Sequence, residues 1–251
     1  MKIVFILGFV AIISALPVEH SNYEDDHAEE LEREFQGDMI ISEEELNKFN
    51  GRIEERLRWT NNEVPYYINM TYFNSDQAEH IHKAAVYLNS LNCLNFVNRT
   101  SQKDYITVSG DATGCSSSVG RVGGSQTIKL KPNNIESGCF RLFTIVHEFL
   151  HALGFHHMQS SHDRENYVNI KYDNITPGKE GNFNLYGTNY VTHFGVPYDY
   201  GSVLHYSAYS FSKNDEATIV PIHDLNGLIM GQRVEMTESD KLRVKKMYGC
   251  I

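Results

Sequence analysis

The stretch HEFLHALGFHH at residues 147–157 constrains this chain more than any other part of its sequence. At helical spacing, His147 and His151 project from one face of a helix, so both imidazoles can reach a single ion. Gly154 can end that helix in a left-handed conformation and bring His157 round as a third ligand. Three neutral imidazoles leave a fourth tetrahedral position open to water, which indicates a catalytic zinc rather than a structural one.

Glu148 lies beside the first ligand and faces the same cleft. Its carboxylate can take a proton from water and later pass it to a leaving amine. The alternative is a chance cluster in a chain with 12 histidines. Five fixed residues at fixed spacing arise by chance in only about one chain in 10⁴, so the zinc-hydrolase interpretation is favoured.

The first residues predict an exported protein. Lys2 is followed by an apolar run at residues 3–13 and by the small residues Ser14 and Ala15, which is typical of a signal peptide over residues 1–16. The run is too short to span a bilayer, and no later stretch is long and apolar enough to do so. We therefore expect a secreted, extracellular protein without a membrane partner.

The formal net charge of −10 is concentrated in one segment. Residues 17–49 hold twelve Asp and Glu against Arg33 and Lys48, whereas the chain from residue 50 onward has 20 acidic and 19 basic residues. The nearly neutral part gives no reason to expect nucleic acid as a partner. A solvated tail is the alternative for the acidic segment. Its place after a signal peptide favours a removable activation pro-segment over residues 17–49, followed by one domain over 50–251.

Regular structure is expected mainly before and within the zinc helix. Ser75 or Asp76 can cap a helix that carries apolar residues at a helical period as far as Leu91, and Thr237 with Asp240 resembles a capping box. The alternating segments predict strands at 64–70, 95–98, 105–109 and 126–130, and the helical segments include the zinc helix at 140–153 and a last helix at 237–247. The expected fold class is α+β, with an irregular half after the zinc helix and a cleft between the halves.

Four cysteines in an exported chain predict two disulfide bonds, for which three pairings are possible: Cys93, Cys115, Cys139 and Cys250. None has a partner at CxxC spacing, so they are poor zinc ligands. Three sequons allow N-glycosylation, at Asn69, Asn98 and Asn174.

Four separate motifs together resemble the astacin family of zinc metalloendopeptidases, which are metzincins. They are FQGD at 35–38, CSSSVGRVGGSQ at 115–126, the zinc helix followed by SSHDRE at 160–165, and PYDYGSVLHYS at 197–207. The resemblance runs from about residue 35 to residue 251. The minimal build resembles short single-domain arthropod astacins, of which a seminal-fluid type is one.

The resemblance implies a twisted, mostly parallel sheet with helices before the zinc site, and one zinc per chain. It implies His147, His151 and His157 as ligands and Glu148 as general base and acid. Tyr206 is implied as a displaceable fifth ligand in the resting enzyme, whose hydroxyl then donates to the oxyanion.

The resemblance also implies how the pro-segment acts. Asp38 of the FQGD motif is implied as the zinc ligand of the zymogen, while Phe35 packs and Gly37 permits a tight backbone approach. Cleavage is implied near Asn50. The implied disulfide bonds join Cys93 to Cys250 and Cys115 to Cys139.

Three positions depart from the family pattern. Leu204 replaces the methionine below the metal, with a similar volume. Met158 stands where a Glu usually follows the third ligand, and Ser161 where an Arg is usual, so the usual docking of the mature amino terminus is in doubt.

The sequence therefore predicts a secreted zinc endopeptidase made as a zymogen and acting on proteins or peptides. The expected partners are these substrates and an activating protease, and the expected state is a monomer. Two alternatives are a non-catalytic binding protein on the same scaffold and a disulfide-held inhibitor or structural protein. Neither would need Glu148 beside His147.

Overall fold

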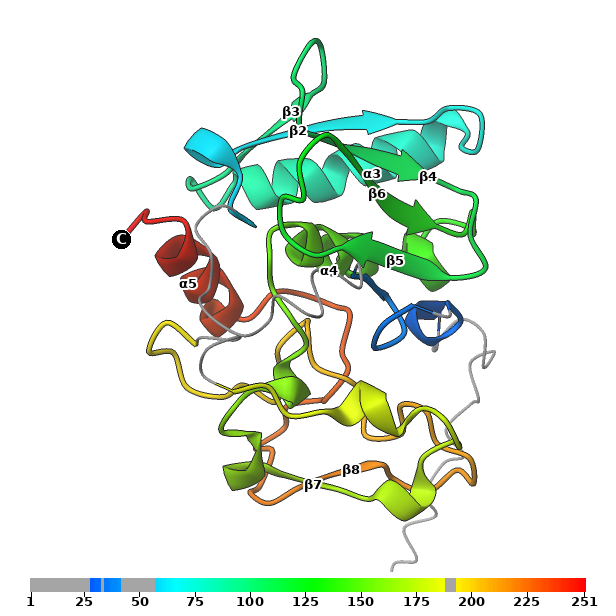
Figure 1. The fold of residues 1–251 in the computed structure, drawn as a ribbon, viewed down its shortest axis with the longest axis vertical. Helices are drawn as coiled ribbons and strands as arrows, with labels where there is room; N and C mark the ends of the chain where they lie inside the picture. Colours follow the sequence, from blue (N-terminus) through cyan, green and yellow to red (C-terminus); the bar gives the residue numbers. More distant parts are fainter. Residues whose placement is uncertain (1–27, 33, 42–56, 188–192) are drawn as a thin grey trace, which may run out of the picture.

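The computed structural model describes residues 28–32, 34–41, 57–187 and 193–251. The predicted signal peptide and the cleavage site near Asn50 lie outside these residues. One half of the molecule consists of a six-stranded sheet with two long helices, and the other half consists mainly of loops and short helices (Figure 1). This arrangement confirms the expected α+β class.

The strands of the sheet follow the order β1-β5-β6-β4-β2-β3, and every neighbouring pair is parallel except β5 with β6. Their bounds are Met39–Ile40 (β1), Glu63–Ile68 (β2), Asn95–Asn98 (β3), Tyr105–Ser109 (β4), Cys115–Ser118 (β5) and Ser125–Leu130 (β6). The strand β1 belongs to the acidic segment and lies at the edge of the sheet that borders the irregular half (Figure 1).

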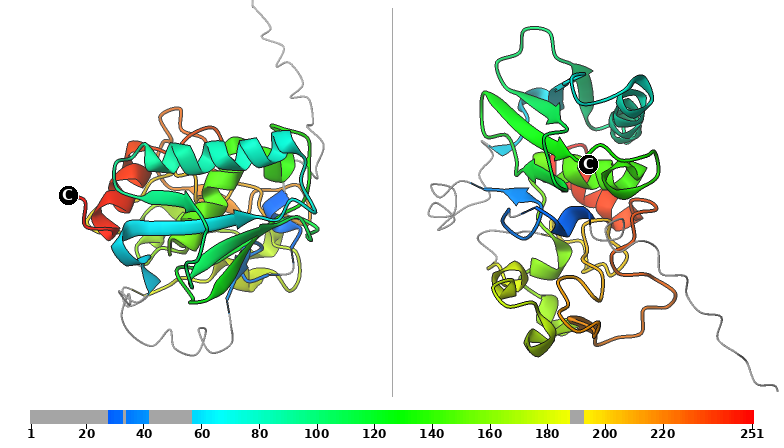
Figure 2. Two further views of the ribbon diagram at one scale, coloured as in Figure 1. Left: turned by 90° about the horizontal axis from the view of Figure 1, so that it is seen from above. Right: turned by 90° about the vertical axis from the view of Figure 1, so that its right-hand side faces the viewer.

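Three α-helices accompany the sheet: α3 (Ser75–Asn89), α4 (Leu142–Ala152) and α5 (Glu238–Met247). The helices α3 and α4 lie on the same face of the sheet (Figure 2). Within the described residues, no helix is long and apolar enough to cross a bilayer. The short 3-10 helices are η1 (Ala28–Glu30), η3 (Thr60–Asn62), η4 (Gly138–Phe140), η5 (Met158–Ser160), η6 (Arg164–Asn166), η7 (Tyr172–Asn174) and η8 (Glu180–Phe183).

The helix α4 is buried almost all round because it lies between the sheet and the irregular half. Its apolar side chains Ile145 and Phe149 are fully buried, and the Phe149 ring meets Phe96 edge to face with the centroids 5.0 Å apart. The indole of Trp59 donates a hydrogen bond of 2.8 Å to Ala152 O at its end. The metal-binding motif therefore stands on a support that packing holds on several sides.

The irregular half has a smaller core of its own and one pair of antiparallel strands, β7 (Val168–Ile170) and β8 (Ile219–Pro221). Phe183 and Ile219 are fully buried in this core. Aromatic rings fill much of it, including Tyr167 and Tyr198, which stack with centroids 4.6 Å apart.

The structure contains the disulfide bonds Cys93–Cys250 and Cys115–Cys139, which is the pairing that the family resemblance implied. The first joins the segment after α3 to the last residues described. The second joins β5 to the turn η4, directly before α4.

Several predicted boundaries were wrong. The helix α3 is capped by Asn74, not by Ser75 or Asp76, because the Asn74 side chain accepts from Gln77 N while Gln77 Oε1 accepts from Asn74 N. That helix ends at Asn89, so Leu91 lies beyond it. The zinc helix begins at Leu142 rather than residue 140, since residues 138–140 form a tighter 3-10 turn. The last helix does begin with the predicted capping box of Thr237 and Asp240.

The capping box of α3 gives a stability prediction. Replacing Asn74 by Ala removes the acceptor for a backbone donor at the helix start and should lower the free energy of unfolding by about 1 kcal/mol. Ser75→Ala is the matched control, because Ser75 is also exposed but does not cap the helix, and it should change stability by only a few tenths. Urea unfolding followed by circular dichroism measures both, and an equal loss in both variants would contradict the assignment.

Candidate metal centre and active site

The geometry of the site begins where α4 ends. Gly154 N donates to His151 O at 2.8 Å and Phe155 N donates to Leu150 O at 3.1 Å, the pair of bonds of a Schellman motif. Gly154 has a φ of +106°, as this turn requires. The chain reverses there and brings His157 back toward the helix face that carries His147 and His151.

Three imidazoles and one carboxylate converge at a buried point. The Nε2 atoms of His147 and His151 are 2.9 Å apart. The Oδ2 atom of Asp38 lies 3.0 Å from Nε2 of His147 and 3.1 Å from Nε2 of His157, and its Oδ1 lies 3.7 Å from Nε2 of His151. All four side chains are at most 1% exposed.

The other ring nitrogen of each histidine faces an oxygen that can only accept a hydrogen bond. Nδ1 of His147 lies 2.8 Å from Val203 O, and Nδ1 of His151 lies 2.7 Å from Phe155 O. Nδ1 of His157 lies 3.0 Å from Oε1 of Gln36. Each Nδ1 therefore carries the hydrogen, and each neutral ring directs the lone pair of Nε2 toward the common point.

This donor set fits zinc. Burial lowers the pKa of His147, and it lowers the pKa of His157 to about 4, so these two rings are neutral at physiological pH. Three neutral rings with Nδ1–H place the lone pairs of their Nε2 atoms 3.0–3.7 Å from the carboxylate oxygens of Asp38, and two of these Nε2 atoms are 2.9 Å apart. Such a cluster of acceptors is repulsive unless a cation lies among them, and nitrogen and oxygen ligands of this kind are those of zinc.

Asp38 reaches the cluster from the acidic segment, through a short turn held against β5. Asp38 O accepts from Ser117 N at 2.7 Å, and the next residue, Met39, begins β1. Gly37 has a φ of +91°, and a Cβ there would stand 2.9 Å from Glu29 O. Phe35 packs with its ring 6.3 Å from that of Tyr186. The FQGD motif therefore places the Asp38 carboxylate at the cluster, and its role in latency stays a prediction.

Glu148 is fully buried next to the cluster, and neither of its carboxylate oxygens has a hydrogen-bond partner among the described residues. Burial and then the negative charge of Asp38 raise its pKa well above the usual range. Burial also opposes ionisation of Asp38, but the positive charge of a protonated imidazole at His157 or His151 outweighs burial and holds the Asp38 pKa well below its usual range. The pKa of Asp38 is thus lowered, whereas the pKa of Glu148 is raised.

The ring of Tyr206 lies beside that of His157, with the two ring centroids 4.6 Å apart. Its hydroxyl donates a hydrogen bond to the backbone carbonyl of Gln36. Burial raises the Tyr206 pKa well above its usual range, so the phenol keeps its proton and remains a donor. The role of Tyr206 as a zinc ligand in the resting enzyme stays a prediction.

The acidic side chains within residues 28–34 contact specific groups of the rest of the chain instead of facing solvent. Glu29 pairs with Arg233 through two bonds, of 2.7 and 3.0 Å, and Glu30 Oε2 accepts from Phe211 N at 2.9 Å. Glu32 Oε1 accepts from Gly114 N at 2.8 Å, and Glu34 pairs with Lys129 at 2.9 Å. The interpretation of this stretch as a solvated tail does not hold for these residues.

Sequence reasoning gave Gln36 no role and could not place Arg233. Gln36 orients His157 through Oε1, and its Nε2 donates to Ser160 Oγ at 2.9 Å and to Tyr186 OH at 3.0 Å. Arg233 is partly buried and pairs with the carboxylate of Glu29. Gln36 occupies the variable position of its motif and Arg233 lies 204 positions from Glu29, so no local pattern marks either of them.

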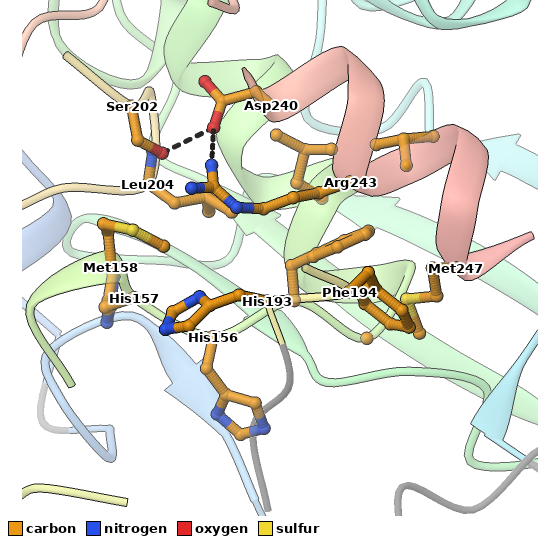
Figure 3. Close-up of a pocket in the computed structure, with 14 residues that line it drawn as sticks. His156, His157, Met158, His193, Phe194, Ser202, Leu204, Asp240, Arg243 and Met247 are labelled. Carbon is orange, nitrogen blue, oxygen red and sulfur yellow. Dashed lines mark hydrogen bonds and ion pairs between the residues drawn. The ribbon is translucent and has the colours of Figure 1, made fainter. Parts of the chain in front are cut away.

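The three departures from the family pattern are all buried. The backbone carbonyl of Leu204 accepts a hydrogen bond of 3.0 Å from Met158 N, the residue after the third histidine. Met158 packs in the core of the irregular half. Behind the cluster, Leu204 and Met158 line a pocket in which Asp240 accepts hydrogen bonds from Ser202 Oγ and Arg243 (Figure 3).

Comparisons with known proteins agree with this geometry. The family model for astacin, which describes a family of peptidases, matches residues 51–249. The chain belongs to the astacin family. Like that family, it is a metalloendopeptidase whose cofactor is one zinc ion, and the cluster of three histidines and Asp38 is suited to hold it.

Individual astacins show how far the similarity extends. Zinc metalloproteinase nas-4 of Caenorhabditis elegans is 36% identical over 224 residues, which is 86% of this chain and 69% of that protein. Meprin A subunit beta of Mus musculus is 37% identical over 223 residues, which is 86% of this chain but only 29% of that protein. The structure of high choriolytic enzyme 1, a hatching enzyme zinc-protease from Oryzias latipes, superposes with a TM-score of 0.69 at 34% identity and covers 77% of this chain and 94% of that one.

The ligand assignment predicts different outcomes for two adjacent histidines. His157→Ala removes one of three converging nitrogens and should weaken zinc binding by more than the roughly 10–100-fold that loss of an outer-shell partner costs. His156→Ala, the matched control, changes a neighbour that does not belong to the cluster and should keep the metal. Zinc content after dialysis against a graded chelator series measures both, and equal retention would exclude His157 as a ligand.

Proposed function

We propose that this chain is a secreted endopeptidase made as a latent precursor, in which residues 17–49 form the pro-segment and residues 50–251 the peptidase. The carboxylate of Asp38 among the three Nε2 atoms is the observation that carries this proposal. A carboxylate there takes the position that a reacting water needs. The contacts that Glu29, Glu32 and Glu34 make with residues of the peptidase domain support the same conclusion.

When bound, zinc supplies the Lewis acidity that activates water and polarises the substrate carbonyl. We assign to Glu148 the role of general base and acid, since its oxygens are buried beside the cluster with no other partner among the described residues. We assign to Tyr206 the hydrogen bond to the oxyanion, because its hydroxyl already donates to a carbonyl at this place. In the resting enzyme, the same hydroxyl serves as a displaceable ligand.

Asp38 has a second effect on the proposed base. Together with burial, its negative charge raises the pKa of Glu148. Departure of Asp38 removes this contribution and favours the carboxylate. One residue therefore both blocks the position of the water and shifts the pKa of the proposed base.

The substrates are proteins or peptides, and the finer statements on partners and location are part of the proposal. The precursor requires an activating protease, and the chain acts outside the cell as a monomer. Of the three sequons, Asn98 is exposed at the end of β3, whereas Nδ2 of Asn174 donates to Ala217 O at 2.8 Å. Asn69 Oδ1 accepts from Thr71 N. We therefore place a glycan at Asn98 first.

The chemistry of Glu148 is tested by a substitution that keeps its shape. Glu148→Gln should retain zinc because the three imidazoles are unchanged, yet it should lose at least about 100-fold in turnover because the proton acceptor is gone. Casein cleavage by the activated protein and zinc content are measured on the same preparation. Cleavage at the wild-type rate would exclude the role of Glu148 and favour the alternative of a binding protein whose function does not need this carboxylate.

The role of Asp38 in latency is tested on the uncleaved precursor. Asp38→Ala should release activity on a quenched fluorescent peptide or cause rapid self-processing, because the carboxylate no longer occupies the cluster. Glu34→Ala is the matched control, since it lies in the same segment and loses only the partly buried pair with Lys129. Pro-segment cleavage is followed on a gel, and equal latency in both variants would show that Asp38 is not the switch.

The pH dependence of this latency has a defined direction. The Asp38 pKa is held below its ordinary value, so the Asp38 carboxylate contributes fully to latency at any pH above that ordinary value. Its contribution to latency is lost only as the pH falls through the lowered pKa. Metal binding acts in the same direction, since protons compete with the metal for the carboxylate. Mild acid should therefore leave the precursor latent.

A further inference from the structure

Among the described residues, one other group of side chains is placed to hold a metal ion: His162, Asp163 and His193. The first two lie between η5 and η6, and His193 lies on the segment that leads to Pro197. One potential ligand atom from each lies within 4.8 Å of the others. The group is separate from the zinc centre, and neither the chemistry nor the latency proposed above uses it.

An ordinary histidine–carboxylate pair explains only part of this cluster. His193 Nε2 lies 2.8 Å from Asp163 Oδ1, and the same oxygen accepts from Ser161 Oγ at 3.2 Å. The His162 ring lies beside this pair, with its centroid 4.8 Å from that of His193. Its Nδ1 is buried without a hydrogen-bond partner in the described part of the chain. A buried imidazole nitrogen without a partner is costly, so its place beside two potential ligands calls for a further group.

We propose that His162, Asp163 and His193 form a second metal site that takes a divalent cation of the zinc type, with water completing the coordination. Two imidazoles and one carboxylate are a nitrogen and oxygen set that zinc accepts. Ligand atoms around tetrahedral zinc stand about 3.3 Å apart, given bonds of roughly 2.0–2.1 Å. Side-chain movements on the order of 1 Å bring atoms now within 4.8 Å to that spacing.

Exposure differs among the three side chains of the cluster. His193 is 6% exposed, whereas His162 and Asp163 are partly exposed. The site is therefore open to entry of an ion from one side and supported by the protein on the other.

An ion at this position would join two segments that frame the zinc centre. Asp163 follows the third zinc ligand by six positions, and His193 lies on the wall of the pocket behind that ligand (Figure 3). Because the three ligands come together only in the folded chain, binding stabilises the folded state by mass action. The second site is thus structural, and its loss should leave the catalytic zinc in place.

The test is the zinc content of the full-length precursor at micromolar free zinc, measured by mass spectrometry of the metal. Wild type should hold two equivalents per chain, and His193→Ala and His162→Ala should each hold one. His223→Ala is the matched control, because His223 is an exposed imidazole on the same half of the molecule, and it should keep two. Added zinc should raise the Tm of wild type and of the control, but not that of the two site variants.

One equivalent in wild type would overturn the proposal, as would a second equivalent that persists in both site variants or that binds only at millimolar zinc. If His193→Ala does not fold, His162→Ala decides the question, because His162 is partly exposed whereas His193 is buried. Retention of the first equivalent shows in each case that the variant is folded.

Discussion

The whole site depends on three hydrogen bonds that fix which nitrogen of each imidazole is free. Val203 O, Phe155 O and Gln36 Oε1 are acceptors, so each bound Nδ1 must be the donor. Two of these acceptors are backbone atoms of the folded peptidase, whereas the third belongs to the acidic segment. The orientation of His147 and His151 is therefore intrinsic to the fold, and that of His157 is shared with a segment proposed to leave.

The described part of the acidic segment is bound through complementary charges and backbone donors. Each of Glu29, Glu30, Glu32 and Glu34 contacts a different group of the rest of the chain: a guanidinium, two backbone amides and an ammonium. Burial opposes ionisation of Glu29, but Arg233 outweighs it and holds the Glu29 pKa below its usual value. Such pairing is specific because a buried charge without its partner is costly. The concentration of negative charge seen in the sequence is thus distributed over separate sites.

The sequence predicted the parts of the structure that local periodicity controls. The ligands on α4 and the turn at Gly154 follow from spacing alone, and β3 and β4 lie where alternation placed them. β5 was missed because its residues Cys115–Ser118 are buried on both faces but mostly polar, so neither alternation nor an apolar run marks it. The two-residue β1 and the pair β7–β8 are too short to show a period. The cap of α3 was one position off because Asn74, Ser75 and Asp76 are all good capping residues and only the backbone selects among them.

Contacts across the chain could not be predicted from any window of sequence. Gln36 meets His157 over 121 positions, and Glu29 meets Arg233 over 204. The family resemblance supplied the role of Asp38 because a motif marks it. The resemblance gave no role to Gln36, because Gln36 occupies the variable position of the FQGD motif.

The disulfide bond Cys93–Cys250 closes a covalent ring of chain around the zinc centre. His147, His151, His157 and Tyr206 all lie between these two cysteines in the sequence. A single cut in any loop between them therefore yields two pieces that remain joined, with every group of the site still in one molecule. In this peptidase, a nick in the long irregular half is therefore a local event that does not separate the molecule into fragments.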